Sequence, residues 1–406
     1  MGGYPDLYSH LFATSSMNHA RITGWVLAVL LSLLPLCSCV TRPDASPPGP
    51  AVELPGELTI NKNAGRGDLL IVDLRLESGE ELPFALDTGS PLTAFPKSFE
   101  PKLGKRFGTV TLDNFGKTPR SGRYATPRLY LGATRLMTGT NAVTYSHQDL
   151  FPHTRHPDMG FLGMDTLKHY CIQLDFAAGK IRFLPPEQVD PAALGNAFPL
   201  KFTKQGCPWI EHGSLIGEKG ARLGIDAGYD SDGGMEHGLL RRQVWRHKGA
   251  AMGEGAAFFP ECTWDGQTYT NLIIGTWPTH TQAPNLMGLR FLARHLVTFD
   301  FPRRTIYLKR TSIGPLPDVD LESAANFLRT LKTQGQLPGW SKDEHGEISW
   351  RFEALRNRVI FTGQKDGDPS RYHYMVGHQC EDGAWKLQRA WRTDPKGHMT
   401  LMYSLP

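Results

Sequence analysis

The chain carries one sequence pattern twice, and this internal repeat limits the possible folds more than any other feature. In both copies an apolar segment ends in an acidic loop, as Phe-Ala-Leu-Asp-Thr-Gly-Ser at residues 84–90 and Leu-Gly-Ile-Asp-Ala-Gly-Tyr at residues 223–229. A duplication with one Asp-x-Gly loop per copy can place two carboxylates face to face on a pseudo-two-fold axis. The repeat therefore predicts two related lobes with a pair of aspartates between them.

A second pair of matching blocks follows the two loops. Each block begins with two apolar residues and a glycine, which is Gly163 in the first copy and Gly288 in the second. A leucine, two apolar strand residues, an Asp-Phe pair and a final apolar pair then occur at the same distances from each glycine. We expect the residues after each glycine to form one short helix that leads into a strand.

Composition favours a β-rich chain of several domains. The 406 residues, 40% of them apolar, are enough to bury sizeable cores and predict two or three domains. The 43 glycines and 30 prolines separate many short runs of Val, Ile, Leu and Phe, which is typical of strands joined by turns. The net charge of +4 comes from interspersed residues of both signs, so no nucleic-acid partner is expected.

The start of the chain resembles an export signal. Residues 25–36 form an apolar run preceded by Arg21, too short to span a bilayer comfortably and typical of a secretory signal peptide. The following Leu-Cys-Ser-Cys resembles a bacterial lipobox with Cys39 as the lipidated residue, and Val40 after it favours the outer membrane. We expect a lipid-anchored protein of the bacterial cell envelope, facing the periplasm. An uncleaved anchor or an incidental apolar segment is the alternative.

The remaining chain changes character along its length. A Pro-rich stretch without apolar periodicity follows Cys39 and suits an extended spacer. Near the other end, Asp320 can cap a helix that starts at Leu321 and runs to about Gln334, with strand-like segments after it and no catalytic motif. The predicted domains are a signal peptide at 1–39, a tether at 40–57, two β-rich lobes at 58–197 and 198–314, and a small α+β domain at 315–406.

The six cysteines give no sign of a metal site. No two of them are spaced as Cys-x-x-Cys, so neither a zinc site nor a thioredoxin-like motif is indicated. We expect no metal and no cofactor. An oxidising envelope would permit a bridge between Cys207 and Cys262 in the second lobe, which the sequence alone leaves open.

Asp-Thr-Gly-Ser at residues 87–90, followed by Phe-Leu-Gly at residues 161–163, resembles the pepsin-like and retropepsin-like aspartic peptidases. In that superfamily each lobe supplies an Asp-Thr/Ser-Gly loop and a later apolar-apolar-Gly segment that crosses behind it. The resemblance covers about residues 58–311 and implies a mainly β fold of two β-barrel lobes with pseudo-two-fold symmetry. It also implies a monomeric endopeptidase whose substrate is a peptide or an unfolded protein.

The chemistry of such a pair follows from the residues themselves. Two carboxylates at hydrogen-bonding distance cannot both ionise at low cost, so Asp87 and Asp226 are expected to share one proton. The ionised member can then take a proton from a water molecule while the other donates to the substrate carbonyl. Gly89 and Gly228 would let the loops approach closely, and Thr88 can hydrogen-bond across to the opposite loop.

The second loop departs from the family pattern at two positions. Ala227 stands where a Thr or Ser would supply the reciprocal hydroxyl, and Tyr229 replaces the usual small residue. Loss of one such hydrogen bond costs about 1 kcal/mol if the site relaxes. Ser90 and Tyr229 are expected to support the loops beside the substrate, and Tyr124 is a candidate for a flap over the cleft.

Two functions therefore remain open from the sequence. The first is a lipid-anchored aspartic endopeptidase, favoured by the intact Asp87 loop and by the retained Asp226. The second is a catalytically silent relative that binds peptides or proteins, favoured by Ala227. For either aspartate taken alone, an Asx turn that only caps its own loop is the structural alternative.

Overall fold

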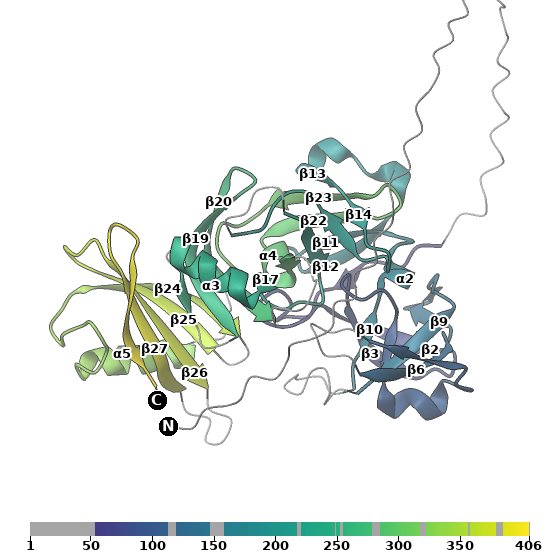
Figure 1. Ribbon diagram of the computed structural model, residues 1–406, viewed down its shortest axis with the longest axis horizontal. Helices are drawn as coiled ribbons and strands as arrows, with labels where there is room; N and C mark the ends of the chain where they lie inside the picture. Colours follow the sequence, from purple (N-terminus) through teal and green to yellow (C-terminus); the bar gives the residue numbers. More distant parts are fainter. Residues whose placement is uncertain are drawn as a thin grey trace, which may run out of the picture. The chain divides into compact units, whose positions relative to one another are not determined.

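Figure 1 shows the computed structural model of the chain. The chain divides into two units, Met1–Ala51 and Val52–Pro406, and every described residue belongs to the second. The predicted signal peptide with Cys39 lies outside the described residues, as do Asp320 and Cys380. The structure describes residues 53–112, 119–146, 158–216, 221–247, 249–251, 255–277, 285–316, 322–355, 358–378 and 385–405.

The first lobe is built on a nine-stranded sheet. Its strands show the period-two alternation of a half-buried sheet, as in Val72, Leu74 and Leu76, which are buried between more exposed neighbours. In spatial order the strands are β5 (Gly108–Thr111), β6 (Arg120–Ala125), β9 (Asn141–Tyr145), β4 (Ala94–Pro96), β10 (Gly160–Leu162), β3 (Glu81–Leu86), β2 (Ile71–Leu76), β7 (Leu129–Leu131) and β8 (Thr134–Arg135).

The second lobe has an eight-stranded sheet and one longer helix, α3 (His237–Arg246). The side chain of Glu236 begins this helix by accepting hydrogen bonds from the N–H groups of Gly238 and Leu239. In spatial order the strands are β14 (Lys201–Phe202), β15 (Pro208–Ile210), β16 (Leu223–Asp226), β21 (Asn285–Gly288), β17 (Gly233–Glu236), β20 (Gln267–Trp277), β19 (Ala256–Trp264) and β18 (Ala250–Ala251).

The two sheets share a local plan, as the internal repeat predicts. In the first lobe β10 runs parallel to β3 and antiparallel to β4. In the second lobe β21 runs parallel to β16 and antiparallel to β17. The repeated block then continues in each lobe into a short helix, α2 (Met164–Leu167) or α4 (Leu289–Leu292). The duplicated sequence therefore folds into duplicated structure around the two acidic loops.

A third sheet of six strands joins the lobes. Its central strands are equivalent parts of the two repeats and pair antiparallel, with Gln173 opposite Thr298 and a 3.1 Å hydrogen bond between these side chains. Asp175 and Asp300 each accept a backbone N–H bond from the turn that follows, so they are hairpin residues. In spatial order the strands are β1 (Leu58–Thr59), β12 (Lys180–Leu184), β11 (Cys171–Asp175), β22 (His295–Asp300), β23 (Thr305–Arg310) and β13 (Asn196–Pro199).

The C-terminal part is an α+β unit, as the sequence predicts. A five-stranded antiparallel sheet packs one face on α5 (Glu322–Thr333), where Leu328, Trp340 and Phe361 are buried. Residues of the other face, including Trp391, pack with Phe258 of the second lobe. The strands are β24 (Gly346–Leu355), β25 (Arg358–Lys365), β26 (Arg371–His378), β27 (Trp385–Thr393) and β28 (Met399–Ser404).

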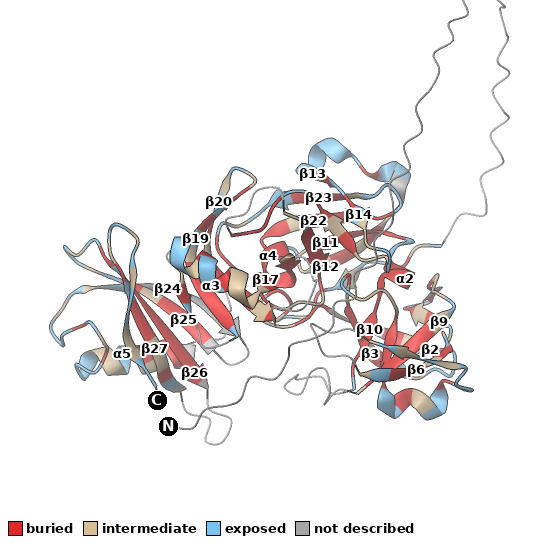
Figure 2. Ribbon diagram, viewed as in Figure 1, coloured by how far each residue is buried: buried red, intermediate tan, exposed pale blue. Residues whose placement is uncertain are grey.

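Burial is concentrated where the sheets meet (Figure 2). The largest cluster of buried apolar side chains draws on both lobes, and Phe84, Ile225, Phe291 and Ile306 are among its members. Short 3-10 helices complete the described structure at Lys97–Lys102, Pro186–Gln188 and Pro191–Ala193. The described chain is mainly β, with two lobes that share a local plan and a small α+β unit, as the sequence predicts.

Within the described segments, no helix combines the length and the apolar character needed to cross a bilayer.

Candidate active site

The two aspartates lie at equivalent ends of equivalent strands. Asp87 directly follows β3, and its backbone N–H donates to the carbonyl of Leu162 on β10 at 3.0 Å. Asp226 is the last residue of β16, and its partner on the parallel neighbour β21 is Gly288. Buried apolar residues fill both strands up to these points, so the packing of the sheets fixes where each loop begins.

Each aspartate first organises its own loop. Oδ1 of Asp87 accepts the N–H groups of Gly89 at 2.8 Å and Ser90 at 3.0 Å. Oδ1 of Asp226 accepts the N–H of Gly228 at 2.9 Å. Each aspartate therefore caps its own loop through an Asx turn, which is the structural role expected of such a residue taken alone. These turns engage only one oxygen of each carboxyl group.

The two carboxyl groups also meet each other. The side chains of Asp87 and Asp226 are hydrogen-bonded to one another. The glycines make this approach possible, because a Cβ added at Gly89 would lie 2.5 Å from Oδ2 of Asp226. In the same way a Cβ at Gly228 would lie 2.5 Å from Cγ of Asp87. The structure thus brings together the four residues that the sequence singled out at the centre of the site.

Burial changes the acidity of both groups. It raises the pKa of Asp87 from 3.8 to about 6, against the lowering effect of the hydrogen bonds from Gly89 and Ser90. Burial also raises the pKa of Asp226 well above its usual value, and the charge of Asp87 raises it further. A pair with these properties keeps a proton to a higher pH than two separate aspartates would.

A hydrogen-bonded link joins the two loops from one side. The hydroxyl of Thr88 donates to the carbonyl of Ile225 at 2.7 Å and accepts the N–H of Ala227 at 2.9 Å. Thr88 is buried, so both bonds are shielded from water. Ala227 is buried as well and has no hydroxyl, so the second loop returns no matching side-chain bond.

Tyr229 occupies space that two glycines leave open. Gly234 on β17 and Gly275 on β20 are paired directly across the sheet. A Cβ added at Gly234 would lie 3.0 Å from the hydroxyl oxygen of Tyr229, and a Cβ added at Gly275 would lie 1.9 Å from the same oxygen. Burial raises the pKa of the phenol, and the charges of Asp230 and Asp226 add to the effect. The bulky residue after the second triplet is therefore accommodated by the sheet behind it.

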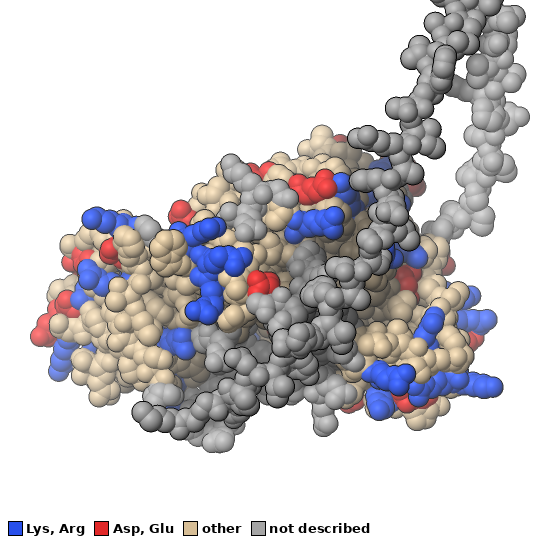
Figure 3. Space-filling view, viewed as in Figure 1, with Lys and Arg blue, Asp and Glu red and all other residues tan. Residues whose placement is uncertain are grey.

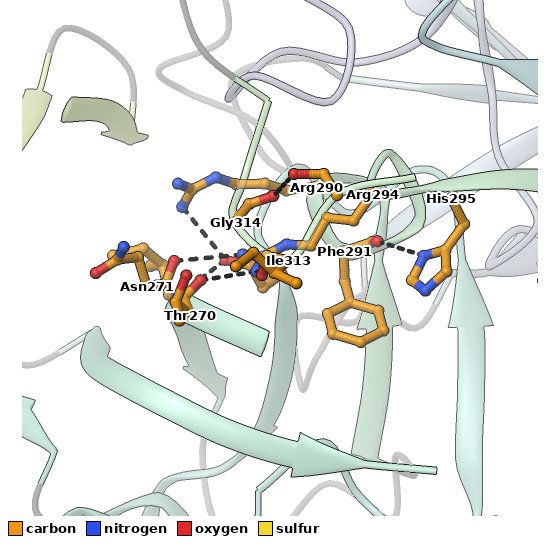
Figure 4. A network of polar contacts seen from close by, with 11 residues as sticks. Thr270, Asn271, Arg290, Phe291, Arg294, His295, Ile313 and Gly314 are labelled. Atoms are coloured by element: carbon orange, nitrogen blue, oxygen red, sulfur yellow. Dashed lines mark hydrogen bonds and ion pairs between the residues drawn. The ribbon is translucent and has the colours of Figure 1, made fainter. Parts of the chain in front are cut away.

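A buried ionic network stands behind the second loop (Figure 4). Asp232 forms ion pairs with Arg294 at 2.5 Å and with Arg290 at 3.3 Å. Arg294 also donates to the backbone carbonyls of Thr270 at 2.8 Å and Ile313 at 3.1 Å. Because the three charged side chains are almost fully buried, they fix the chain that follows the second aspartate.

This network has a counterpart of different chemistry in the first lobe. Thr93 follows Asp87 at the distance at which Asp232 follows Asp226, and Asp165 matches Arg290 in the repeated block. The hydroxyl of Thr93 donates to Asp165 at 2.8 Å. Sequence reasoning missed both pairs, although comparison of the two repeats at equal offsets would have found them.

Cys207 is a neighbour of the site that the sequence did not identify. Its thiol donates to the carbonyl of Gly89 at 3.1 Å. Burial, followed by the charges of Asp87 and Asp226, raises the pKa of this thiol to about 12. Cys207 and Cys262 are both free thiols, so the bridge that the sequence permitted is not formed.

The structure also places the predicted site residues Ser90 and Tyr124. The hydroxyl of Ser90 donates to the carbonyl of Leu92 at 2.7 Å, which stabilises the turn of the first loop. Tyr124 lies on β6 with its ring buried in the core of the first lobe, and burial raises its pKa. The flap role of Tyr124 stays a prediction.

No group of three His, Cys, Asp or Glu side chains that could hold a metal ion lies within the described ranges.

Comparisons with known proteins find similarity among solved structures alone. No protein-family model matches the chain, and no curated protein is similar to it in sequence. Among solved structures, basic 7S globulin from soybean is similar at 11% identity with a TM-score of 0.42, over 64% of this chain and 95% of the globulin. An aspartic proteinase from Irpex lacteus is similar at 14% identity with a TM-score of 0.39, over 64% of this chain and 97% of the proteinase. Identities and TM-scores this low carry no information about activity.

Proposed function

We propose that this protein is an aspartic endopeptidase that hydrolyses peptide bonds with water activated between Asp87 and Asp226. The observation that carries the proposal is the hydrogen-bonded pair of buried carboxyl groups, one from each lobe, with raised pKa values. Structural ion pairs usually join opposite charges, whereas two mutually repelling acids kept together in a buried site indicate proton-transfer chemistry.

The proposed reaction uses the shared proton directly. The ionised carboxylate takes a proton from a water molecule while the other carboxyl donates its proton to the carbonyl oxygen of the peptide bond. The water oxygen attacks the carbonyl carbon, and the C–N bond breaks when the nitrogen receives a proton from the pair. No covalent intermediate with the protein is formed. The substrate is a peptide or an unfolded protein segment, and the protein acts as a monomer without a cofactor.

Substitution of the two acids tests this proposal. Asp87→Asn and Asp226→Asn should each reduce cleavage of an unfolded protein by about a hundredfold or more, because neither variant can complete the proton transfer. Asp175→Asn is the matched control, since this hairpin aspartate lies outside the pair and should leave the activity unchanged. Pepstatin should inhibit the parent protein. Cleavage that survives in either dyad variant would assign the activity to another site.

The alternative is a protein that binds peptides without cleaving them, and Ala227 favours it because the cross-loop link comes from one side. Under this alternative the parent protein would bind a pepstatin-like peptide but release no cleavage product. Binding with no product from the purified parent over a wide pH range would replace the proposal with this one.

We also propose that Cys39 anchors the protein to the bacterial envelope through lipid. Cys39→Ser should release the protein from membrane fractions, whereas Cys37→Ser is the matched control and should leave it bound. A Cys39→Ser protein that remains in the membrane fraction would overturn the anchoring proposal and leave the catalytic one untouched.

A further inference from the structure

Helix α3 carries an exposed surface that the proposed reaction does not use. Its inward side chains include the buried Leu240 and Gln243. On the outward side Trp245 is 84% exposed, which makes it the most exposed large apolar side chain among the described residues. A tryptophan left this open in a helix packed on a sheet suggests a surface that meets something other than water.

Basic residues surround this tryptophan. Arg241, Arg242 and Arg246 are all exposed, and the helix contains no acidic residue. Within the described parts of the chain these three guanidinium groups make no ion pair, and Lys and Arg side chains gather over α3 in Figure 3. Helical spacing places Arg241 and Arg242 within one turn of Trp245, so one face presents both chemistries. We call Arg241, Arg242, Trp245 and Arg246 the α3 face.

The stability of the helix does not explain this composition. Arg242 and Arg246 are one turn apart, and like charges at this spacing repel each other. Arg246 near the C-terminus is favoured by the helix dipole, but Arg241 and Arg242 lie further from that end. Glu236, the nearest acid at the start of the helix, is engaged with the N–H groups of Gly238 and Leu239. Among the described residues, the positive charge of Arg241, Arg242 and Arg246 is therefore available to an external anion.

We infer that the α3 face docks on a bilayer that contains anionic phospholipid. Guanidinium groups bind lipid phosphates in a forked geometry, and a tryptophan places its ring at the level of the headgroups. A helix with basic residues beside an exposed aromatic ring is the kind of surface that lies in the membrane interface.

Other macromolecules fit the α3 face less well. The remaining exposed large apolar side chains of the described residues lie in other segments, at Phe107, Ile313, Leu401 and Leu405. The α3 face thus lacks the contiguous apolar centre of a stable protein interface. A nucleic-acid site would need a longer basic stripe than this helix of ten residues offers. A headgroup layer needs only scattered phosphates and one inserted ring.

The proposed lipid anchor would strengthen a contact that is weak alone. An extended Pro-rich chain spans about 3 Å per residue, so the tether at residues 40–57 would keep the start of the folded unit within roughly 60 Å of the bilayer. Docking would then be intramolecular, with a high effective concentration. This step depends on the anchoring proposal, but the chemistry of the α3 face does not. Because α3 directly follows β17, docking would also orient the second lobe relative to the membrane.

Vesicle flotation of a protein that begins at Val40 tests the inference without the anchor, since this form keeps the compact unit Val52–Pro406. It should float with vesicles of phosphatidylcholine and phosphatidylglycerol, should not float with phosphatidylcholine alone, and should be released by salt. Arg241→Gln, Arg242→Gln and Arg246→Gln combined should weaken binding at least about tenfold. Trp245→Ala should weaken it even at low salt.

The matched control removes the same charge elsewhere. Arg120→Gln, Arg135→Gln and Arg371→Gln combined also change exposed arginines, and this variant should bind like the parent. Equal losses in both triple variants, or no flotation of the parent, would overturn the inference. Binding to soluble polyglutamate as strong as to vesicles would assign the α3 face to an acidic protein instead. Peptide cleavage should be the same in every variant, so a failed docking result leaves the proposed reaction intact.

Discussion

Two acidic side chains share one environment, and that environment determines their chemistry. Asp87 and Asp226 come from loops of opposite lobes, yet each is approached by the glycine of the other loop. Removal from water is the main cause of both raised pKa values, and mutual charge adds to it for Asp226. The site therefore stores unfavourable free energy whenever the shared proton is lost.

The first prediction concerns stability against pH. Because the pKa of Asp87 rises from 3.8 to about 6 on folding, its stabilising contribution is complete below pH 3.8 and is lost as the pH rises through about 6. Asp87→Asn stays neutral, so it should be more stable than the parent at pH 7 by about 1 to 3 kcal/mol. The difference should disappear near pH 4. Denaturant unfolding at the two pH values checks this, and a variant less stable than the parent at pH 7 would contradict it.

The second prediction concerns the link between the loops. Thr88→Val keeps the shape of the side chain but leaves the N–H of Ala227 and the carbonyl of Ile225 without their buried partner. We expect a loss of about 1 to 3 kcal/mol in the free energy of unfolding, together with reduced peptide cleavage. Thr88→Ser retains the hydroxyl and should recover most of both. Equal effects of Val and Ser would show that the hydroxyl does not hold the loops together.

At the scale of elements, the second loop depends on the strands and the helix behind it. Tyr229 lies over paired glycines of β17 and β20, and the Asp232 ion pairs fix the chain that follows. In the first lobe the equivalent position is occupied by Thr93, whose neutral hydroxyl donates to Asp165. Two copies of one motif have thus kept their backbone and diverged in the side chains that support it.

The third prediction follows from the space under Tyr229. A methyl group at Gly275 would lie 1.9 Å from the Tyr229 hydroxyl oxygen, so Gly275→Ala should destabilise the protein by about 1 to 3 kcal/mol. Tyr229→Phe removes the clashing oxygen, so the double variant should be more stable than Gly275→Ala alone. Gly255→Ala is the control, because a Cβ there meets no atom within 4 Å. Thermal unfolding of the four proteins measures the coupling, and strictly additive effects would refute the contact.

Sequence reasoning reached the parts of the site that depend on local pattern. The repeated block predicts the two strand ends, and the glycines of each triplet predict the close approach of Asp87 and Asp226. The burial of Arg290 and Arg294 was not predicted, because charged residues are rarely buried. Their burial depends on the ion pairs that both arginines form with Asp232. The burial of the Tyr124 ring was not predicted either, because it depends on packing between distant strands.

At the scale of the whole described unit, the C-terminal sheet is part of the fold of the second lobe. Trp391 and Met375 from this sheet pack with Phe258 and Ile273 of β19 and β20. Arg389 also donates to the backbone carbonyl of Ala251 at 2.7 Å. The segment that the sequence left without a role therefore covers apolar surface of the lobe that carries Asp226.

The fourth prediction tests this packing. Trp391 is 2% exposed, so Trp391→Ala should reduce the free energy of unfolding by about 3 to 5 kcal/mol. The exposed Trp245 is the control, and Trp245→Ala should change stability by less than about 0.5 kcal/mol. Cleavage activity should fall in parallel with stability in the Trp391 variant. An unchanged melting temperature would show that the sheet and the lobe are independent.

The pairing of Gln173 with Thr298 locates the symmetry axis of the molecule. These residues occupy the same place in the two repeats and lie directly opposite each other in β11 and β22. Equivalent strands that pair about equivalent residues form a contact in which both sides present the same surface. Two chains with only one lobe each would therefore assemble through an isologous contact. Fusion of both halves into one polypeptide makes that association independent of protein concentration, and it allows the two loops to carry different residues, Thr88 in the first and Ala227 in the second.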